Sequence, residues 1–140
     1  MEIKINMITT KKEFNDCLNI RKRVFIEEQN IDEKIENDDD KINAFYIVAK
    51  KDLISVGTAR YRKTSIGIKL ERFAVIKKYR NLGVGKALVL FLLKKLKNES
   101  NIYLNSQEEV VDFYSNLGFK IVGDVFYEAN IPHFKMKFSL

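Results

Sequence analysis

The chain has 140 residues, and its composition of 46% hydrophobic and 31% charged residues is typical of one globular domain with a buried core. No apolar run is long enough to cross a bilayer, no signal-peptide pattern opens the chain, and a single cysteine excludes an internal disulfide. The formal net charge of +6 is spread along the chain without interleaved aromatic residues. We therefore expect a single domain over residues 1–140 in the cytoplasm, with no membrane or nucleic-acid partner; a homodimer stays open.

The N-terminal segment predicts a helix. Thr10, with Glu13 three positions later, forms a capping signal for a helix that runs to about Gln29. Cys17 falls on the apolar face of this helix, so we expect a small buried hydrophobic residue rather than a reactive thiol.

An acidic connection follows this helix. Residues 30–43 are polar and contain three consecutive aspartates at positions 38–40. A calcium loop needs carboxylates at alternating positions, a turn glycine and a closing glutamate, which this run lacks. No metal is therefore predicted.

Two strands are expected next, over residues 44–50 and 53–62, with a turn at Lys51-Asp52 and a bulge near Gly57. Together with a strand over residues 70–76 they form an antiparallel meander.

Three arginines, Arg60, Arg62 and Arg72, lie on neighbouring strands of this meander. Alternate residues of a strand share a face, so some of these side chains are expected to lie together. Pointing inward, they would hold a phosphate or carboxylate group of a substrate, whereas pointing outward they would lie in solvent at a sheet edge. Both readings stay open, and Arg60 and Arg72 are candidate substrate-binding residues.

The segment from Leu70 to Lys97 reads as a strand, a cationic glycine turn and an amphipathic helix. The helix begins at the turn, where unpaired N–H groups and the positive end of the dipole favour an anion such as a phosphate. A Walker A loop is excluded because Arg80 and Ala87 stand where its first glycine and its Ser or Thr would be. A dinucleotide fingerprint is weak because Leu88 replaces its third small residue.

The C-terminal part predicts a short strand over residues 102–105 and a helix over residues 107–117, which Gly118 ends as a left-handed cap. A hairpin of residues 120–127 and 133–138, joined by the only proline, closes the chain.

The glycine turn and the end of the later helix over residues 107–117 resemble motifs of one enzyme family. Arg80, Gly83 and Gly85 match the R/Q-x-x-G-x-G/A signature of the GCN5-related N-acetyltransferase (GNAT) family, and Phe113 to Phe119 match its F-Y-x-x-x-G-F signature. The resemblance covers essentially the whole chain. It implies an α/β (α+β) GNAT fold: a mixed, mostly antiparallel central sheet of about six to seven strands, flanked by about four helices.

Two further stretches resemble the ElaA-like or YjcF-like subgroup of this family. Residues 21–29 match R-x-x-V-F-x-x-E-Q, and residues 126–136 match F-x-E-x-x-I-P-H-x-x-M. The subgroup specifies fold and cosubstrate more closely than it specifies an acceptor.

The resemblance implies an enzyme that transfers the acetyl group of acetyl-CoA to a primary amine, without a metal. The residues that it places at the cosubstrate are Phe73, Ala74, Val75, Arg80, Asn81, Leu82, Gly83, Val84, Gly85, Lys86, Asn105, Tyr114 and Asn116.

The resemblance also implies catalytic roles. The N–H of Val75 would polarise the thioester carbonyl, and Tyr114 would donate a proton to the leaving thiolate. The amine must first lose a proton, and the base stays open between Glu71, Glu28 and an activated water. His133 is a further catalytic candidate because imidazole ordinarily titrates near neutrality.

The acceptor is expected to be a small-molecule amine that attacks directly in a ternary complex. Arg21 and Gln29 of the first helix are candidate acceptor-binding residues. If Arg60, Arg62 and Arg72 converge, an amino-sugar phosphate such as glucosamine 6-phosphate is the concrete acceptor. Transfer to a protein lysine or N-terminal amine, and a non-catalytic acyl-CoA-binding module, are the alternatives.

Overall fold

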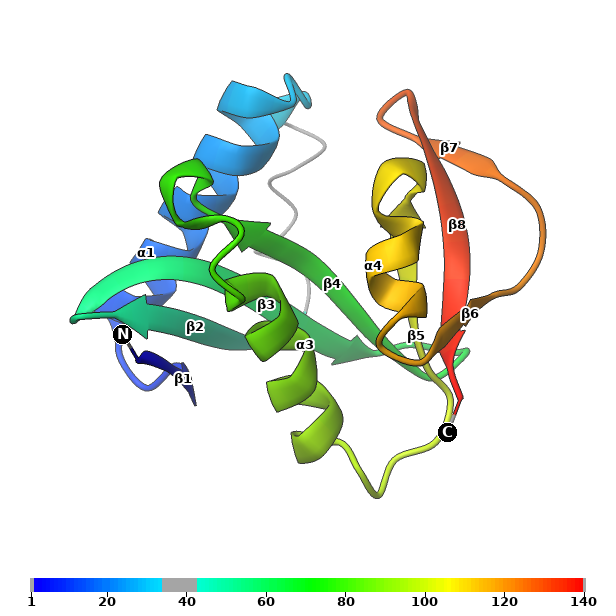
Figure 1. Ribbon diagram of the computed structural model, residues 1–140, viewed down its shortest axis with the longest axis horizontal. Coiled ribbons are helices and arrows are strands. Elements are labelled where there is room, and N and C mark those ends of the chain that lie inside the picture. Colours follow the sequence, from blue (N-terminus) through cyan, green and yellow to red (C-terminus); the bar gives the residue numbers. More distant parts are fainter. Residues whose placement is uncertain (1, 34–42, 140) are drawn as a thin grey trace. The chain divides into compact units, whose positions relative to one another are not determined.

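The computed structural model describes residues 2–33 and 43–139, which form a mixed sheet with helices (Figure 1). The strand order is β1-β2-β3-β4-β5-β8-β6, and β7 pairs with β8. β4 runs parallel to β5, whereas the pairs β1–β2, β2–β3, β5–β8, β6–β8 and β7–β8 are antiparallel. The expected mixed, mostly antiparallel sheet is therefore confirmed, with eight strands and three α-helices among the described residues. The acidic residues at 38–40 lie outside those residues.

The elements have the following bounds. The strands are β1 Ile3–Met7, β2 Phe45–Lys51, β3 Ile54–Lys63, β4 Ile68–Val75, β5 Ile102–Gln107, β6 Phe119–Ile121, β7 Phe126–Glu128 and β8 Ile131–Phe138. The helices are α1 Lys11–Arg21, the π-helix η1 Lys22–Glu28, the short 3₁₀ turns η3 Lys77–Tyr79 and η4 Glu108–Val110, α3 Val84–Lys95 and α4 Val111–Ser115.

The chain divides into two compact units. Unit 1 comprises Met1–Tyr61 and Arg72–Asn98, and unit 2 comprises Arg62–Glu71 and Glu99–Leu140. Strands β3 and β4 each contribute residues to both units.

The first helix begins at the predicted cap. The Thr10 hydroxyl accepts a hydrogen bond from the N–H of Glu13 at 3.1 Å, and the Glu13 carboxylate accepts one from the N–H of Thr9 at 2.8 Å. The first bond satisfies an N–H group that the first helical turn would leave unpaired, and the second fixes the chain just before the cap. After Arg21 the α-helix continues as the π-helix η1, whose last turn is closed by a bond from Gln29 N to Val24 O.

In unit 1, α1 and α3 lie on opposite faces of the β1–β2–β3 strands (Figure 1). Successive residues of β2 point to alternate faces, so Tyr46 and Val48 pack with Cys17 on the α1 side. Ile47 and Ala49 are also fully buried, on the other face. A strand buried on both sides explains the continuous apolar run that sequence reasoning assigned to a strand.

Gly57 brings α3 close to the sheet. Ala49 pairs with Gly57 and Lys50 with Ser55, so Val56 is the extra residue of the expected bulge. A Cβ at Gly57 would lie 2.9 Å from Val84 Cγ1, which is too close for any larger residue without a shift. The start of α3 therefore packs against β3 through a glycine.

In unit 2, β5 and β8 are the central pair, and α4 packs on the face that carries Phe119. The Tyr114 and Phe119 rings meet edge to face with centroids 6.0 Å apart, and Phe119 contacts Phe138 at 5.3 Å. Gly118 has φ 101°, and a Cβ there would lie 2.9 Å from the Phe138 ring. The predicted left-handed cap after α4 is confirmed.

Three sequence predictions about local structure were wrong. The tight turn between β2 and β3 is centred on Asp52 and Leu53, which both have positive φ, one residue later than expected. The only proline, Pro132, lies within β8 opposite Tyr127, and the turn before it uses Ala129 and Asn130 with positive φ. The first arm of the hairpin is interrupted, because β6 and β7 are separate short strands along β8.

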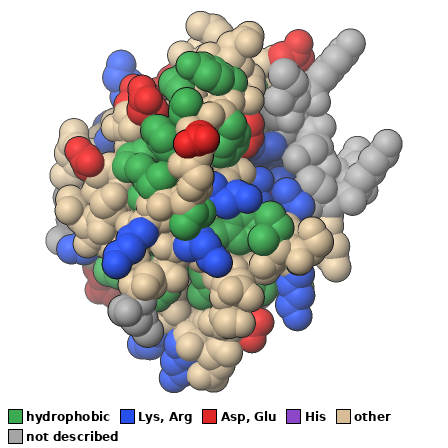
Figure 2. Space-filling view, turned by 90° about the vertical axis from the view of Figure 1, so that its right-hand side faces the viewer, with side chains coloured by type: hydrophobic (Ala, Val, Ile, Leu, Met, Phe, Trp, Pro, Cys, Tyr) green, Lys and Arg blue, Asp and Glu red, His purple; other side chains and the backbone are tan. Residues whose placement is uncertain are grey.

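The outer side of unit 2 exposes apolar residues. Ile121, Val122, Val125 and Tyr127 belong to β6, β7 and the segment between them, and all are exposed. Figure 2 shows hydrophobic side chains on the face turned to the viewer, with lysines and arginines next to them.

We predict that Glu13 makes stability depend on pH in the acid range. Its hydrogen bond to Lys50, the N–H of Thr9 and the amide of Asn6 lower the pKa of this carboxyl from its ordinary value of 4.5 to about 2. A lowered folded-state pKa stabilises the protein fully above about pH 4.5 and loses this stabilisation as the pH falls towards 2. Glu13→Gln should lower the free energy of unfolding at pH 7 by about 1.5 kcal/mol, and urea denaturation should show the difference shrinking below pH 4.5.

The exposed carboxylate of Glu99 provides the control for this prediction. Glu99→Gln should change the free energy of unfolding by less than about 0.5 kcal/mol at pH 7 and at about pH 2.5. A Glu13→Gln deficit that persists unchanged at pH 2.5 would contradict the assignment.

Candidate active site

The glycine turn of unit 1 has the geometry of an anion site. Gly83, with φ 84°, precedes α3, and a Cβ built on it would meet nothing within 4 Å. Asn81 also has positive φ, at 65°, so the chain turns sharply before the helix. The first N–H groups of α3 have no partner within the helix and point along its axis. The open side of Gly83 and these N–H groups leave room for an anion.

The surroundings of this turn are basic. Lys77 and Lys78 precede it, Arg80 lies within it, and Lys86 is in the first turn of α3. No acidic residue occurs in the first turn of α3. The charge favours an anion and supplies long-range attraction for one.

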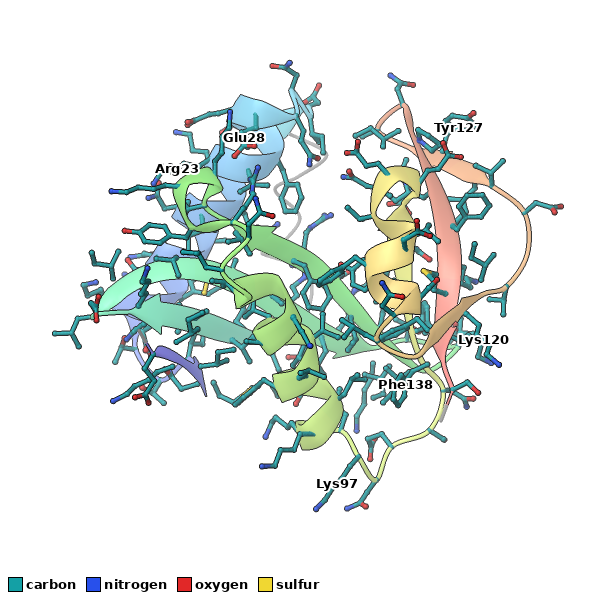
Figure 3. All side chains as sticks on the ribbon, in the orientation of Figure 1. Arg23, Glu28, Lys97, Lys120, Tyr127 and Phe138 are labelled. Carbon is teal, nitrogen blue, oxygen red and sulfur yellow. The ribbon has the colours of Figure 1, made fainter. Side chains whose placement is uncertain are left out.

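Arg80 braces the turn against two other segments. Its Nε donates to Val75 O at 2.9 Å, at the end of β4. Its Nη1 and Nη2 donate to the two carboxylate oxygens of Glu28 at 2.9 and 2.8 Å. Figure 3 shows Glu28 at the end of η1, beside the loop that leads to α3. The predicted cosubstrate residue Arg80 and the predicted base Glu28 are thus brought together as an ion pair.

Apolar packing connects the same segments. Ile20 and Val24 of the first helical segment form a buried cluster with Ala74 and Ile76, and the Tyr79 ring packs against it together with Phe25. The helix that matches R-x-x-V-F-x-x-E-Q therefore contacts the segment of the glycine turn through apolar packing as well as through the ion pair.

The backbone of β4 is irregular at its centre. Arg72 has φ 59°, a left-handed conformation that is uncommon for a non-glycine residue within a strand. Pairing with β5 runs from Ile68 to Leu70, ahead of this kink. Such conformations are costly and are found where a function requires them. Phe73, Ala74 and Val75, the predicted pantetheine and thioester contacts, come directly after it.

Two of the candidate substrate arginines are buried around a tyrosine. Arg21 and Arg60 are 1% and 0% exposed, and both donate to the Tyr46 hydroxyl, at 3.3 and 3.0 Å. The two guanidinium groups therefore meet on the α1 face of the sheet, whereas the sequence grouped Arg60 with Arg62 and Arg72. Gln29 lies at the end of η1, half-buried.

Glu71 of unit 2 lies between two cations. Arg62 Nε lies 2.8 Å from Glu71 Oε2 and Lys69 Nζ lies 3.2 Å from Oε1, and the Glu71 side chain is 9% exposed. Arg62, which the sequence placed with Arg60 and Arg72, thus forms an ion pair with Glu71. Glu71 is thus held within an ion-pair network of unit 2.

The remaining predicted residues of unit 2 are distributed over α4, β5 and β8. Burial raises the pKa of Tyr114 far above its ordinary value, so this phenol stays protonated across the physiological range. Asn116 is exposed at the C-terminal end of α4. Asn105 donates through Nδ2 to Glu128 Oε1 at 3.3 Å, and its Oδ1 is buried with no hydrogen-bond partner among the described residues.

His133 is oriented by its own strand. Its Nδ1 lies 2.7 Å from the carbonyl oxygen of Ile131, and its ring stacks on Phe126 at a centroid distance of 5.8 Å. Sequence reasoning singled out His133 in the F-x-E-x-x-I-P-H match but passed over Phe126 and Glu128 in the same match. The signal for both residues was present in that motif.

The described residues contain no group of three or more His, Cys, Asp or Glu side chains suited to a metal ion. Within residues 2–33 and 43–139 there is also no helix long and apolar enough to cross a membrane.

Comparison with known proteins agrees with this geometry. Residues 10–140 match the family model of the "Acetyltransferase (GNAT) domain". YyaT of Bacillus subtilis is 36% identical, over 94% of this chain and 93% of its own. The N-acetyltransferase YjcF of the same organism is 32% identical, over 90% of this chain and 92% of its own.

Solved structures share the fold. Escherichia coli ElaA superposes with a TM-score of 0.86 at 24% identity, covering 99% of this chain and 100% of its own. A GNAT family acetyltransferase from Elizabethkingia anophelis, solved with acetyl-CoA bound, superposes with a TM-score of 0.71 at 16% identity, over 99% and 98% of the two chains. The chain belongs to the GNAT acetyltransferase family and is similar to its ElaA and YjcF members.

Proposed function

We propose that this N-acetyltransferase moves the acetyl group of acetyl-CoA to the primary amine of a small molecule, by direct attack within a ternary complex. The observation that carries the proposal is the turn at Gly83, which offers open space and the N-terminus of α3 to an anionic pyrophosphate. We take both units as parts of one acetyltransferase domain, because one family model matches residues 10–140.

Residues of unit 1 would hold the cosubstrate. The N–H groups at the start of α3, from Val84 to Lys86, would bind its phosphates, and the backbone of Phe73 to Val75 would hold its pantetheine arm. Bound acetyl-CoA supplies an activated thioester carbonyl. The N–H of Val75 would polarise that carbonyl and stabilise the negative charge that develops on its oxygen.

Direct attack is favoured over an acetyl-enzyme because the only thiol is unsuitable. Cys17 is 0% exposed, and its Sγ lies 3.6 Å from the carbonyl oxygen of Ile47. Burial raises its pKa to about 11, so little nucleophilic thiolate exists at neutral pH.

A small amine without a phosphate is favoured over an amino-sugar phosphate. Arg21 and Arg60 are buried and donate to Tyr46, so their guanidinium groups stabilise the α1 side of unit 1 rather than an open surface. Glucosamine 6-phosphate belongs in the first acceptor panel as the direct test of this inference.

Release of free CoA from acetyl-CoA, measured against amino acids, polyamines, amino sugars, their phosphates and lysine peptides, tests the proposed function. Amine-dependent release is expected with a small amine. Acetyl-CoA binding without amine-dependent release from any acceptor would favour a non-catalytic binding module instead.

We predict that Tyr114 acts as the proton donor to the leaving thiolate. Its raised pKa leaves the phenol protonated at neutral pH, so it can donate a hydrogen bond to the developing thiolate, although the same shift makes it a weaker acid. Tyr114→Phe should lower kcat about 100-fold and leave the Kd for acetyl-CoA within about twofold. Steady-state kinetics and calorimetric titration separate the two quantities.

Tyr127→Phe is the matched control for this substitution, because the Tyr127 side chain is 69% exposed in the same unit. It should leave kcat unchanged. Full turnover by Tyr114→Phe would remove the proton-donor assignment.

We predict that Glu28 positions Arg80 and is not the base. Both carboxylate oxygens of Glu28 accept hydrogen bonds from Arg80. Because the ion pair is partly exposed, removing it should weaken acetyl-CoA binding only modestly. Glu28→Gln should raise the Kd for acetyl-CoA about fivefold, with kcat at saturation retained. Glu27→Gln, on the exposed neighbour, should change neither quantity.

A large fall in kcat with an unchanged Kd would instead identify Glu28 as the base. Tighter binding of acetyl-CoA by Glu28→Gln would show that Glu28 holds Arg80 away from the phosphates.

A further inference from the structure

One face of the unit 2 sheet collects polar side chains from three strands. His133 of β8 lies opposite Gln107 of β5 on one side and opposite Phe126 of β7 on the other. Directly opposed residues share a face, and so do alternate residues of one strand. Asn105 and Glu128 therefore lie on the same face as His133.

The hairpin of β7 and β8 curls over this face. Asn105 is registered with Lys135, and Glu128 with Ile131, four residues away along β8. Four residues of a flat strand span about 13 Å, yet Asn105 Nδ2 lies 3.3 Å from Glu128 Oε1. The contact requires the hairpin to bend towards β5. His133 lies on the same face, at the β8 position midway between those registered with Asn105 and Glu128.

Each of these three side chains offers a hydrogen-bond acceptor. The Ile131 carbonyl, 2.7 Å from His133 Nδ1, can only accept, so Nδ1 is the donor, and in a neutral imidazole Nε2 is then the acceptor. Asn105 Oδ1 is buried and has no hydrogen-bond partner among the described residues. Glu128 contributes a carboxylate that is anionic at neutral pH.

A site lined by acceptors and one negative charge suits a cation with several N–H donors. A primary ammonium group carries three such donors, and each of the three side chains can accept one of them. Most buried polar atoms have a partner, so the orphaned oxygen of Asn105 points to a ligand donor. An anion would find no donor in the set except the Asn105 amide.

The nearest cation on this face is directed elsewhere. Lys135 lies opposite Asn105, but its Nζ is 5.7 Å from the centroid of the Tyr103 ring. Tyr103 lies on the side of Asn105 away from Gln107 and His133, and its hydroxyl is 2.7 Å from that of Thr64. Lys135 is thus engaged with Tyr103, on the other side of Asn105.

We propose that Asn105, Glu128 and His133 bind the primary ammonium group of the acceptor and that His133 Nε2 removes its proton. The proton-transfer part rests on the proposed acetyl transfer. One proton of R–NH₃⁺ passes to Nε2 and then to solvent, which leaves a neutral amine with a free lone pair. That lone pair forms the N–C bond as the C–S bond breaks with its electrons on sulfur. The further proton lost by nitrogen balances the proton gained by sulfur.

The binding part is tested on the wild-type protein without turnover. Because the chain has one histidine, the imidazole nitrogens give an unambiguous pair of NMR signals. A long-range proton–nitrogen spectrum should show the tautomer protonated at Nδ1. Propylammonium should shift the Nε2 signal saturably, and tetramethylammonium, with equal charge but no N–H donor, should not.

Three substitutions test the individual roles. His133→Gln should lower kcat about 100-fold, since it keeps polarity but cannot take the proton. Asn105→Ala and Glu128→Gln should each raise the KM for the amine found in the acceptor panel about tenfold, with the Kd for acetyl-CoA unchanged. Lys137→Gln, on an exposed residue of β8, is the control and should change none of these quantities.

Failure of this inference is distinguishable from failure of the proposed function. Amine-dependent CoA release with an Nε2 signal that ignores propylammonium, or responds equally to tetramethylammonium, would overturn the ammonium site and leave acetyl transfer intact. An increased Kd for acetyl-CoA in Asn105→Ala, with an unchanged amine KM, would move Asn105 to the cosubstrate and also overturn it. No amine-dependent release from any acceptor would overturn the acetyl transfer and the base role of His133 together.

Discussion

Arg80 joins three segments that are far apart in the sequence. Its guanidinium bonds to the Val75 carbonyl at the end of β4 and, through two parallel hydrogen bonds, to Glu28 at the end of η1. The planar guanidinium is suited to this task because its donors form a fixed fork, which a lysine could not reproduce. The turn that presents the N-terminus of α3 is held in place by this one side chain and by the apolar cluster beneath it. The motif arginine therefore links the turn to β4 and η1.

The two units differ in the charged and polar groups that they present. Unit 1 surrounds its glycine turn with lysines and arginine, which favour phosphate. Unit 2 carries acceptor atoms at Asn105, Glu128 and His133, which favour an ammonium group. The proposed acetyl donor has a polyanionic tail, which suits the surroundings in unit 1, and the proposed acceptor is a cation, which suits those in unit 2.

The two buried arginines of unit 1 are hydrogen-bonded inside the fold. Arg21 and Arg60 would be costly inside the fold without acceptors, and the Tyr46 hydroxyl supplies one to both. Arg60 also lies 5.8 Å from the centroid of the Tyr46 ring, a favourable position for a cation. Sequence reasoning grouped Arg60 with Arg62 and Arg72 and left open whether they bind a phosphate or lie in solvent. In the structure Arg60 meets Arg21 at the Tyr46 hydroxyl, and Arg62 pairs with Glu71.

The sequence by itself determined the elements and the family. The cap at Thr10, the bulge at Gly57, the helix after the glycine turn and the end of α4 at Gly118 follow from local rules, because glycine, threonine and apolar spacing act over a few residues. The match of Arg80, Gly83 and Gly85 with Tyr114 indicated an acetyltransferase, and the family comparison confirms it. The roles of individual site residues remain predictions.

Tertiary structure decided what local rules could not reach. The Arg80–Glu28 pair joins residues 52 positions apart, and the Asn105–Glu128 contact depends on how far the β7–β8 hairpin curls. The break between β6 and β7, and the place of Pro132 inside β8, depend on pairing with another strand. Periodicity and turn chemistry specify where an element begins and ends. Which side chains meet across elements depends on packing and register, and these are properties of the folded chain as a whole.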